Sequence, residues 1–153
     1  MANKITVLLV DDHTLVRRGF RRLLEDDAEI EVVGEASDGD EAVKLALKLT
    51  PQVVVMDCAM PGTSGLVATR RILQGAPKTA VLMLSMHSEA TLVRQAMDAG
   101  ARGYVLKGAI DLDLAAAVAP PARQPARRHL GGGPRAAAQG DPGRARRPRP
   151  RRR

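Results

Sequence analysis

The chain has little cysteine and no long hydrophobic run, and each absence excludes a class of protein. Its single cysteine, Cys58, excludes an internal disulfide bond. No apolar run approaches the ~18 residues of a membrane-spanning helix, and the N-terminus lacks the charged-then-apolar pattern of a signal peptide. We find no internal repeat. We therefore expect a soluble, cytoplasmic protein without a membrane partner.

Excess positive charge is absent from the first 118 residues. They contain 13 Lys and Arg against 16 Asp and Glu, a net charge of −3. Residues 119–153 contain 11 Arg and one acid, Asp141, so the whole chain reaches +7. About 118 residues can bury one core but leave no room for a second domain of ordinary size. We predict one domain over residues 1–118 and a disordered low-complexity tail over 119–153.

Short apolar runs separated by helical patterns predict the fold class. Runs of this length are typical of parallel strands that are covered on both faces of a sheet. Helices are indicated by amphipathic spacing at 13–25 and by start signals at Asp38, Ser64 and Ser88. The predicted order is βαβαβαβαβ followed by a fifth helix, which gives a three-layer α/β/α sandwich. The predicted strands are 5–10, 30–36, 53–56, 80–84 and 104–106.

Polar residues follow four of these runs directly, where each predicted strand ends. They are Asp11 and Asp12, Asp57, Ser85 and Lys107. The carboxyl ends of parallel strands share one edge of a sheet, and ligands bind there. Three carboxylates, a hydroxyl and an ammonium group should therefore meet at one place. We interpret this convergence as a phosphoryl-transfer site.

The same residues carry a family resemblance. Val10-Asp11-Asp12-His13, the segment 57–65 (DCAMPGTSG), Ser85 and Gly103-Tyr104-Val105-Leu106-Lys107 resemble the CheY-like receiver domain of bacterial response regulators. Leu84-Ser85-Met86-His87 and the segment 99–104 further resemble the NarL/FixJ/LuxR-type subgroup. The resemblance covers residues 5–118 and implies a flavodoxin-like sheet of five parallel strands in the order 2-1-3-4-5.

The resemblance also implies a role for each site residue. Asp57 is the phosphoacceptor, and it binds Mg²⁺ or Mn²⁺ together with Asp12 and the backbone carbonyl of Ala59. Asp11 holds the metal through water or shapes the site. Lys107 bridges to Asp57 or to the phosphoryl group. Such a protein is a phosphorylated signal-transduction component and not an enzyme, apart from its own phosphorylation and dephosphorylation.

The resemblance implies a switch and partners as well. Ser85 moves toward the phosphoryl group, and Tyr104 turns inward into the space that Ser85 leaves, so the face at 85–110 changes. The expected partner is a sensor histidine kinase, a homodimer is left open, and the output of the subgroup is transcription regulation. We expect His13 and His87 to take no part in a ligand cluster.

The tail lacks the helix-turn-helix output domain that full-length members of this subgroup carry. Of residues 119–153, 30 of 35 are Ala, Gly, Pro or Arg, and seven are proline, which excludes a continuous helix. We expect the fifth helix to be truncated at Pro120-Pro121 after roughly two turns. Codons made only of G and C specify these four amino acids, so a frameshift near codons 118–120 of a GC-rich gene would produce such a tail. An Arg-rich disordered arm and a Pro-rich partner-binding segment remain open.

Two further functions are compatible with the sequence. One is non-specific nucleic-acid binding through the Arg-rich tail, since arginines contact phosphates and no base-reading element is present. The other is a metal-dependent phosphatase on the same scaffold, with Asp57 as nucleophile. Against the second, Ala59 stands two residues after Asp57, where one such phosphatase class has a second acid.

Overall fold

The sheet has five strands, and every neighbouring pair is parallel. The computed structural model describes residues 4–87, 89–107 and 110–123. Within them the order across the sheet is β2-β1-β3-β4-β5. This confirms the flavodoxin-like order expected from the sequence. The strands are β1 (Ile5–Val10), β2 (Ile30–Ala36), β3 (Val53–Asp57), β4 (Ala80–Ser85) and β5 (Gly103–Leu106).

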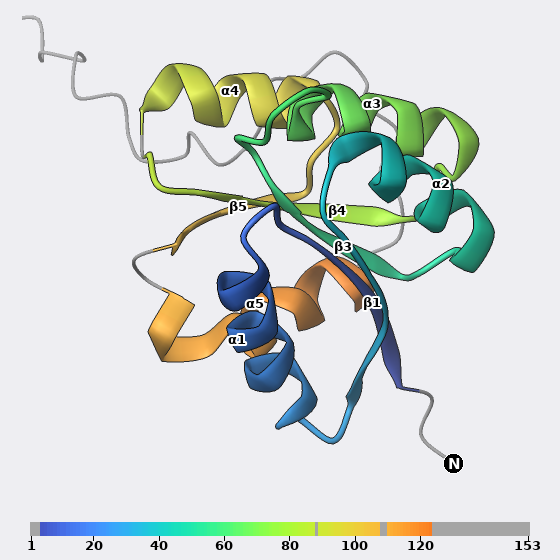
Figure 1. Ribbon diagram of the computed structural model, residues 1–153, viewed down its shortest axis with the longest axis vertical. Helices are drawn as coiled ribbons and strands as arrows, with labels where there is room; N and C mark the ends of the chain where they lie inside the picture. Colours follow the sequence, from blue (N-terminus) through green and yellow to red (C-terminus); the bar gives the residue numbers. More distant parts are fainter. Residues whose placement is uncertain (1–3, 88, 108–109, 124–153) are drawn as a thin grey trace, which may run out of the picture.

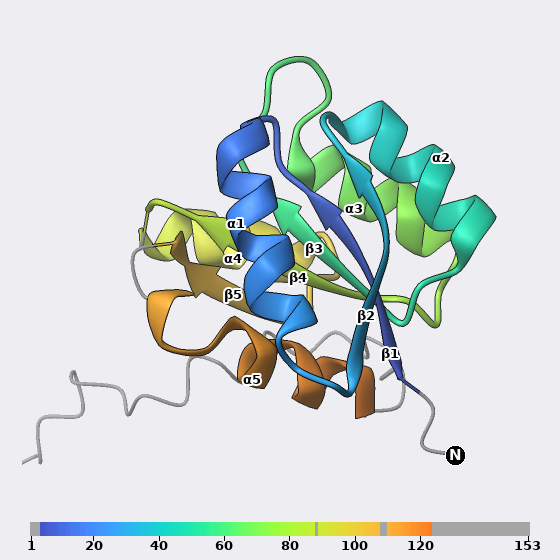
Figure 2. The same cartoon turned by 60° about the horizontal axis from the view of Figure 1, so that its bottom comes forward.

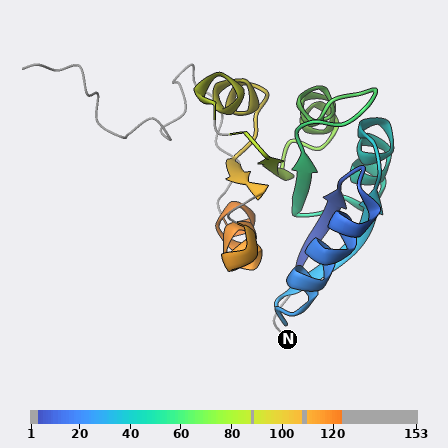
Figure 3. The same ribbon diagram turned by 60° about the vertical axis from the view of Figure 1, so that its left-hand side comes forward.

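Helices cover both faces of the sheet and complete a three-layer sandwich. Helices α2, α3 and α4 lie on one face, and α1 and α5 lie on the other (Figures 1 and 3). Figure 2 shows α1 and α5 next to each other, and their residues are in contact. The helices are α1 (Thr14–Glu25), α2 (Gly39–Leu49), α3 (Gly65–Gly75), α4 (Ala90–Asp98) and α5 (Ile110–Arg123).

The sheet separates two hydrophobic cores because side chains alternate along each strand. One core lies under α2, α3 and α4 and includes Ala46, Ile72 and Met83. The other lies under α1 and α5 and includes Leu24 and Leu114. Strand β3 is buried along its whole length and contributes to both cores. A strand covered on both faces explains why its sequence is a continuous apolar run rather than an alternating one.

Side-chain caps start two of the helices as predicted. The Asp38 carboxylate accepts a 2.8 Å hydrogen bond from the Glu41 N–H, and the Ser64 hydroxyl accepts one of 3.3 Å from Val67. Gly100 follows α4 with a φ of +105°, a conformation that favours glycine. The predicted start at Ser88 lies outside the described residues. These caps therefore fix where α2 and α3 begin.

The end of the fifth helix differs from the prediction. The expected truncation at Pro120-Pro121 is wrong, because α5 continues through both prolines to Arg123. Each proline lacks the N–H that would bond to the carbonyl four residues before it, so packing at the end of α5 has to offset the loss of two hydrogen bonds. Pro121 is buried, Ala122 packs against the core, and Arg102 Nη1 donates a 3.1 Å hydrogen bond to the Pro121 carbonyl. The helix therefore covers its part of the sheet up to Ala122.

Candidate functional site

The strand order brings the predicted polar residues to one edge of the sheet. β1, β3, β4 and β5 are consecutive neighbours in the sheet, and all run in the same direction. Asp57 and Ser85 are the last residues of β3 and β4, Asp11 follows β1, and Lys107 follows β5. The structure therefore assembles residues that are far apart in the chain. As predicted, Asp11, Asp57, Ser85 and Lys107 stand at the same edge of the sheet.

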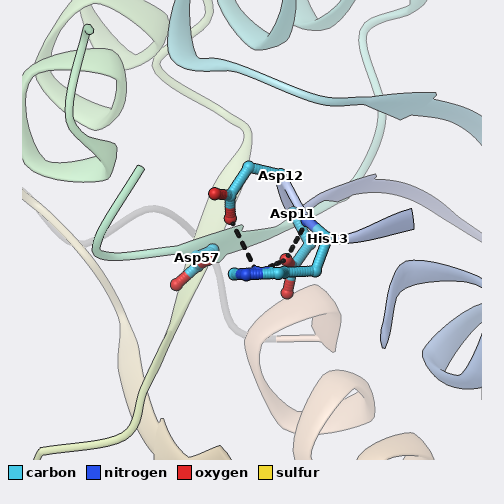
Figure 4. A group of neighbouring side chains, drawn as sticks. All are labelled: Asp11, Asp12, His13 and Asp57. Carbon is cyan, nitrogen blue, oxygen red and sulfur yellow. Dashed lines mark hydrogen bonds and ion pairs between the residues drawn. The ribbon is translucent and has the colours of Figure 1, made fainter. Parts of the chain in front are cut away.

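Four potential ligand side chains cluster at this edge. Asp11, Asp12, His13 and Asp57 each offer one ligand atom, and these atoms all lie within 4.8 Å of one another (Figure 4). Asp11 is fully buried and Asp57 is 3% exposed, whereas His13 is exposed. Buried carboxylates this close to one another need positive charge to offset their repulsion.

Lys107 supplies part of that charge. Its Nζ lies 3.1 Å from Asp11 Oδ2 and 3.1 Å from Asp57 Oδ2. Burial alone would lower the pKa of Lys107, but the ion pairs with Asp57 and Asp11 outweigh it and raise the pKa. Lys107 is therefore charged at neutral pH. It bridges the ends of β1 and β3 from the end of β5.

Asp57 is held in a dry environment. Burial raises the pKa of its carboxyl group, and the charge of Asp11 adds to the rise, while Lys107 and the Ala59 N–H oppose it. The Ala59 N–H donates to Asp57 Oδ1 at 3.3 Å. Burial also raises the pKa of the neighbouring Cys58 thiol.

Asp12 is the carboxylate with unused hydrogen-bonding capacity. Among the described residues, its Oδ1 is the buried side-chain oxygen without a hydrogen-bond partner. His13 Nδ1 lies 3.1 Å from this oxygen, as an ion-pair partner when protonated (Figure 4). A buried carboxylate oxygen left without a donor is suited to a cation, and hard oxygen ligands of this kind suit Mg²⁺. The residues present therefore fit a magnesium ion.

Ser85 and Tyr104 both contact the loop that follows β4. The Ser85 hydroxyl, which is buried, accepts a 3.0 Å hydrogen bond from the His87 N–H. The Tyr104 hydroxyl donates a 2.7 Å hydrogen bond to the His87 carbonyl. The two side chains singled out by the sequence are therefore joined through one residue of that loop.

Sequence reasoning missed contacts that three residues make at this site, although one of them, Gly65, stands in the segment 57–65 that carries the family resemblance. It assigned His13 to no ligand cluster, whereas the structure places His13 beside Asp11 and Asp12. The position of His13 directly after Asp11 and Asp12 in the sequence could have indicated that it lies in the cluster. Arg17 contacts the Asp11 carbonyl, and Gly65 lies against the Asp57 carbonyl. Neither contact has a signal in a single sequence, because both depend on how separate elements pack.

Comparisons with known proteins agree with this geometry. The family model "response regulator receiver domain" matches residues 7–119. The response regulator UvrY of Escherichia coli is 49% identical over 114 residues, which are 74% of this chain and 52% of UvrY. The response regulator GacA of Pseudomonas aeruginosa is 47% identical over 105 residues, 69% of this chain and 49% of GacA. The chain thus spans about half the length of the curated relatives it matches.

Solved structures give the same result. The signal receiver domain of a putative response regulator NarL from Mycobacterium tuberculosis has a TM-score of 0.75 at 36% identity, over 78% of this chain and 97% of that one. A LuxR-family response regulator from Aurantimonas has a TM-score of 0.70 at 38% identity, over 77% and 87% of the two chains. These matches give no support to the phosphatase or the nucleic-acid-binding alternative. No helix in the described part of the chain is long and apolar enough to cross a membrane.

Proposed function

This chain belongs to the response regulator receiver family, and we propose that it accepts a phosphoryl group on Asp57 from the phosphohistidine of a sensor kinase. The observation that carries the proposal is the buried Asp57 carboxylate, 3.1 Å from Lys107 and grouped with two further carboxylates at the ends of neighbouring strands. The predicted boundary at residue 118 is too early: the domain responsible extends to Arg123, because α5 runs to that residue and Ala119 and Ala122 pack against the core. The rest of the predicted tail, residues 124–153, lies outside the described residues. Its proposed compartment is the cytoplasm.

The acidic cluster would hold Mg²⁺ or Mn²⁺ through Asp12, Asp57 and the backbone carbonyl of Ala59, with Asp11 acting through water or shaping the site. The bound ion supplies electrostatic screening between the carboxylates and the oxygens of an incoming phosphoryl group. The unpartnered Oδ1 of Asp12 supports this assignment. Asp11 is already occupied by Lys107 and by the His13 N–H, which fits an indirect role.

In the transfer itself, an oxygen lone pair of Asp57 forms the new bond to phosphorus. The bond from phosphorus to the donor nitrogen breaks, and its electron pair leaves with the donor imidazole. Lys107 stays charged and pairs with the phosphoryl oxygens. No residue in the cluster needs to remove a proton from Asp57, which is consistent with catalysis by positioning and electrostatics. Outside this self-modification and its reversal by water, we assign the chain no enzymatic activity.

The response to phosphorylation would run through the β4–α4 loop. A phosphoryl group brings about −1.5 to −2 charge and strong acceptor oxygens, so it draws in the nearest hydroxyl donor, Ser85. Ser85 would then give up its contact with the His87 N–H, and Tyr104 would turn inward. The contacts of both side chains with His87 support a coupled movement. A hydrogen bond to a charged group contributes ~1.5–3 kcal/mol, so the result is a population shift of the 85–110 face.

The output of the complete regulator would be control of transcription. One matched relative is a transcriptional regulatory protein, DegU of Brevibacillus brevis, 43% identical over 69% of this chain. A sensor histidine kinase is the partner on the input side. On the output side, a homodimer is left open, as dimers form in members of this family.

Intact-mass measurement after treatment with acetyl phosphate tests the proposal. We expect one added phosphoryl group in the presence of Mg²⁺ and none in EDTA. Asp57→Asn should abolish the addition, because Asp57 is the buried carboxylate that contacts Lys107 at the carboxyl ends of the strands. The matched control is Asp26→Asn, which changes an acid at the end of α1 and should be labelled like the wild type. Labelling of Asp57→Asn to the wild-type extent would refute the assignment of the acceptor.

A further inference from the structure

Arg17 connects the acidic site to the sheet from outside the ligand cluster. It lies in the first turn of α1, and its side chain is 15% exposed. Its Nη1 donates a 2.5 Å hydrogen bond to the backbone carbonyl of Asp11. Its Nε donates a 3.0 Å hydrogen bond to Glu35 Oε1 on β2. One guanidinium group therefore spans the loop after β1 and the neighbouring strand.

The other polar groups of Asp11 are also held. Its N–H donates to the Ala36 carbonyl at 3.1 Å, next to the last paired residues of β1 and β2. Its carboxylate accepts from the His13 N–H at 2.9 Å and from Lys107 at 3.1 Å. Arg17 provides the remaining contact, to the carbonyl. Asp11 is thereby fixed through both its backbone and its side chain.

Fixing this carbonyl determines where Asp12 points. The carbonyl carbon and oxygen of Asp11 lie in the same planar peptide unit as the Asp12 nitrogen. A guanidinium that holds the carbonyl oxygen thus sets the orientation of that plane and the position of the Asp12 Cα, from which the Asp12 side chain starts. The carboxylates of Asp11, Asp12 and Asp57 repel one another, so this loop would otherwise open.

Because Glu35 neutralises its charge, Arg17 acts on the site by fixing the position of the Asp11 carbonyl and not by adding positive charge. Arg17 and Arg21 both bind its carboxylate, at 3.0 and 2.6 Å. Arg17 is consequently neutralised by Glu35 and adds little net positive charge to the cluster. A planar guanidinium can serve two acceptors in fixed directions, which a lysine ammonium on a flexible stem does less well.

From these contacts we infer that Arg17 is a positioning residue for the metal site: it holds the Asp11 carbonyl against Glu35 so that Asp12 stays aimed at the cation. The inference rests on the proposed function, in which Asp12 is a metal ligand. Partners of this kind, one step removed from the ion, commonly change metal affinity by about 10–100-fold when they are removed.

Calorimetric titration of the EDTA-treated protein with Mg²⁺ tests the inference, using Arg17→Met and Arg17→Lys. We expect both to raise the Kd for Mg²⁺ by roughly tenfold. The lysine variant should not restore affinity, because charge without the two-pronged geometry does not hold the carbonyl. It also keeps a long side chain, so it remains informative if Arg17→Met does not fold. The Mg²⁺ concentration that gives half the maximal rate of phosphorylation by acetyl phosphate should rise by a similar factor, which is a second readout of metal binding.

Arg21→Met is the matched control. Arg21 binds the same Glu35 and also Glu25, but no hydrogen bond links it to the Asp11 loop among the described residues. It should lower thermal stability comparably while leaving the Kd for Mg²⁺ at the wild-type value. Unchanged Mg²⁺ affinity in both Arg17 variants, or an equal loss in Arg21→Met, would overturn the inference. A wild-type protein that binds Mg²⁺ but is not phosphorylated would instead refute the proposed function and leave the role of Arg17 standing.

Discussion

At the scale of single residues, the tightest packing at the site is between Gly65 and the backbone of Asp57. Gly65 begins α3, and a Cβ at this position would collide with the Asp57 carbonyl oxygen. Any side chain would therefore have to displace the backbone that carries the acceptor. Gly65 is required for the close approach of helix and strand, independently of its conformational freedom.

The substitution Gly65→Ala should consequently damage both stability and function. We expect a loss of about 1–3 kcal/mol in the free energy of unfolding, the range for overpacking in a close-packed region. Displacement of Asp57 should slow phosphorylation by up to about a hundredfold. Urea unfolding and the rate of labelling by acetyl phosphate measure the two effects.

Gly19→Ala is the control for this prediction. Gly19 lies within α1, and a Cβ there would have nothing within 4 Å. Alanine in a helix interior is more favourable than glycine by roughly 0.5–1 kcal/mol, so this variant should be more stable than wild type and equally well phosphorylated. A Gly65→Ala protein that behaved like Gly19→Ala would show that the close approach is not a constraint.

The site residues that could be predicted from the sequence are those that stand directly at the end of a predicted strand. Asp11, Asp57, Ser85 and Lys107 each follow an apolar run directly, and the rules for parallel sheets then place them together. Arg17 could not be identified in this way, because it reaches an Asp11 backbone oxygen and a side chain of β2 from a third element. Backbone acceptors have no sequence signature.

At the scale of elements, the last turn of α5 is held by a hydrogen bond from a side chain outside the helix. Arg102 precedes β5 and donates from Nη1 to the carbonyl of Pro121. Burial lowers the pKa of Arg102, but an arginine stays charged at any ordinary pH. The contact is therefore a charge-assisted hydrogen bond to the final turn of the helix.

Removal of that contact in Arg102→Met should loosen the last turn of α5. We expect about 1.5 kcal/mol of lost stability, the lower end for a hydrogen bond to a charged group. Amide hydrogen exchange at Ala122 should become faster, while exchange in the strands changes much less. Arg94→Met, at an exposed position on α4, should alter neither quantity. Unchanged exchange at Ala122 in Arg102→Met would contradict the assigned role.

The end of α5 also marks where sequence reasoning was limited at this scale. A pair of prolines is a strong helix-stop signal, and it correctly describes the loss of two N–H donors. The proline pair does not indicate that Pro121 is buried, or that the Arg102 guanidinium donates a hydrogen bond to the Pro121 carbonyl. Tertiary contacts outweighed a local preference, so the helix continued past the position that the sequence favours for its end.

At the scale of the whole molecule, the network of Arg17, Arg21 and Glu35 ties α1 to β2 and makes the stability of the fold depend on pH. Burial alone would raise the pKa of Glu35, but the hydrogen bonds from Arg21 and Arg17 outweigh it and lower the pKa below its ordinary value of 4.5. The folded state thus binds the Glu35 proton less tightly than the unfolded state. This contribution to stability is present above pH 4.5 and is lost as the pH falls through the lower folded-state pKa.

Glu35→Gln should remove this acid-dependent part. Compared with wild type, we expect lower stability at pH 7 and a difference that shrinks as the pH falls below 4.5, since the wild-type carboxylate then also becomes neutral. Urea unfolding at a series of pH values measures it. Glu31→Gln changes an exposed acid on the same strand and serves as the control. A difference between wild type and Glu35→Gln that stayed constant with pH would show that the charge of Glu35 is not responsible.

The burial of β3 has a consequence for how a local chemical event spreads. Every residue of β3 is buried, and buried central strands belong to the most stable part of a domain. β5 is only partly covered, and Ala96 is the buried residue of α4. The acceptor thus stands on a rigid strand, and the elements beyond it at the sheet edge are less constrained. A phosphoryl group at Asp57 therefore acts from a rigid strand on two less constrained elements, and Lys107 at the end of β5 links that edge of the sheet directly to the acceptor.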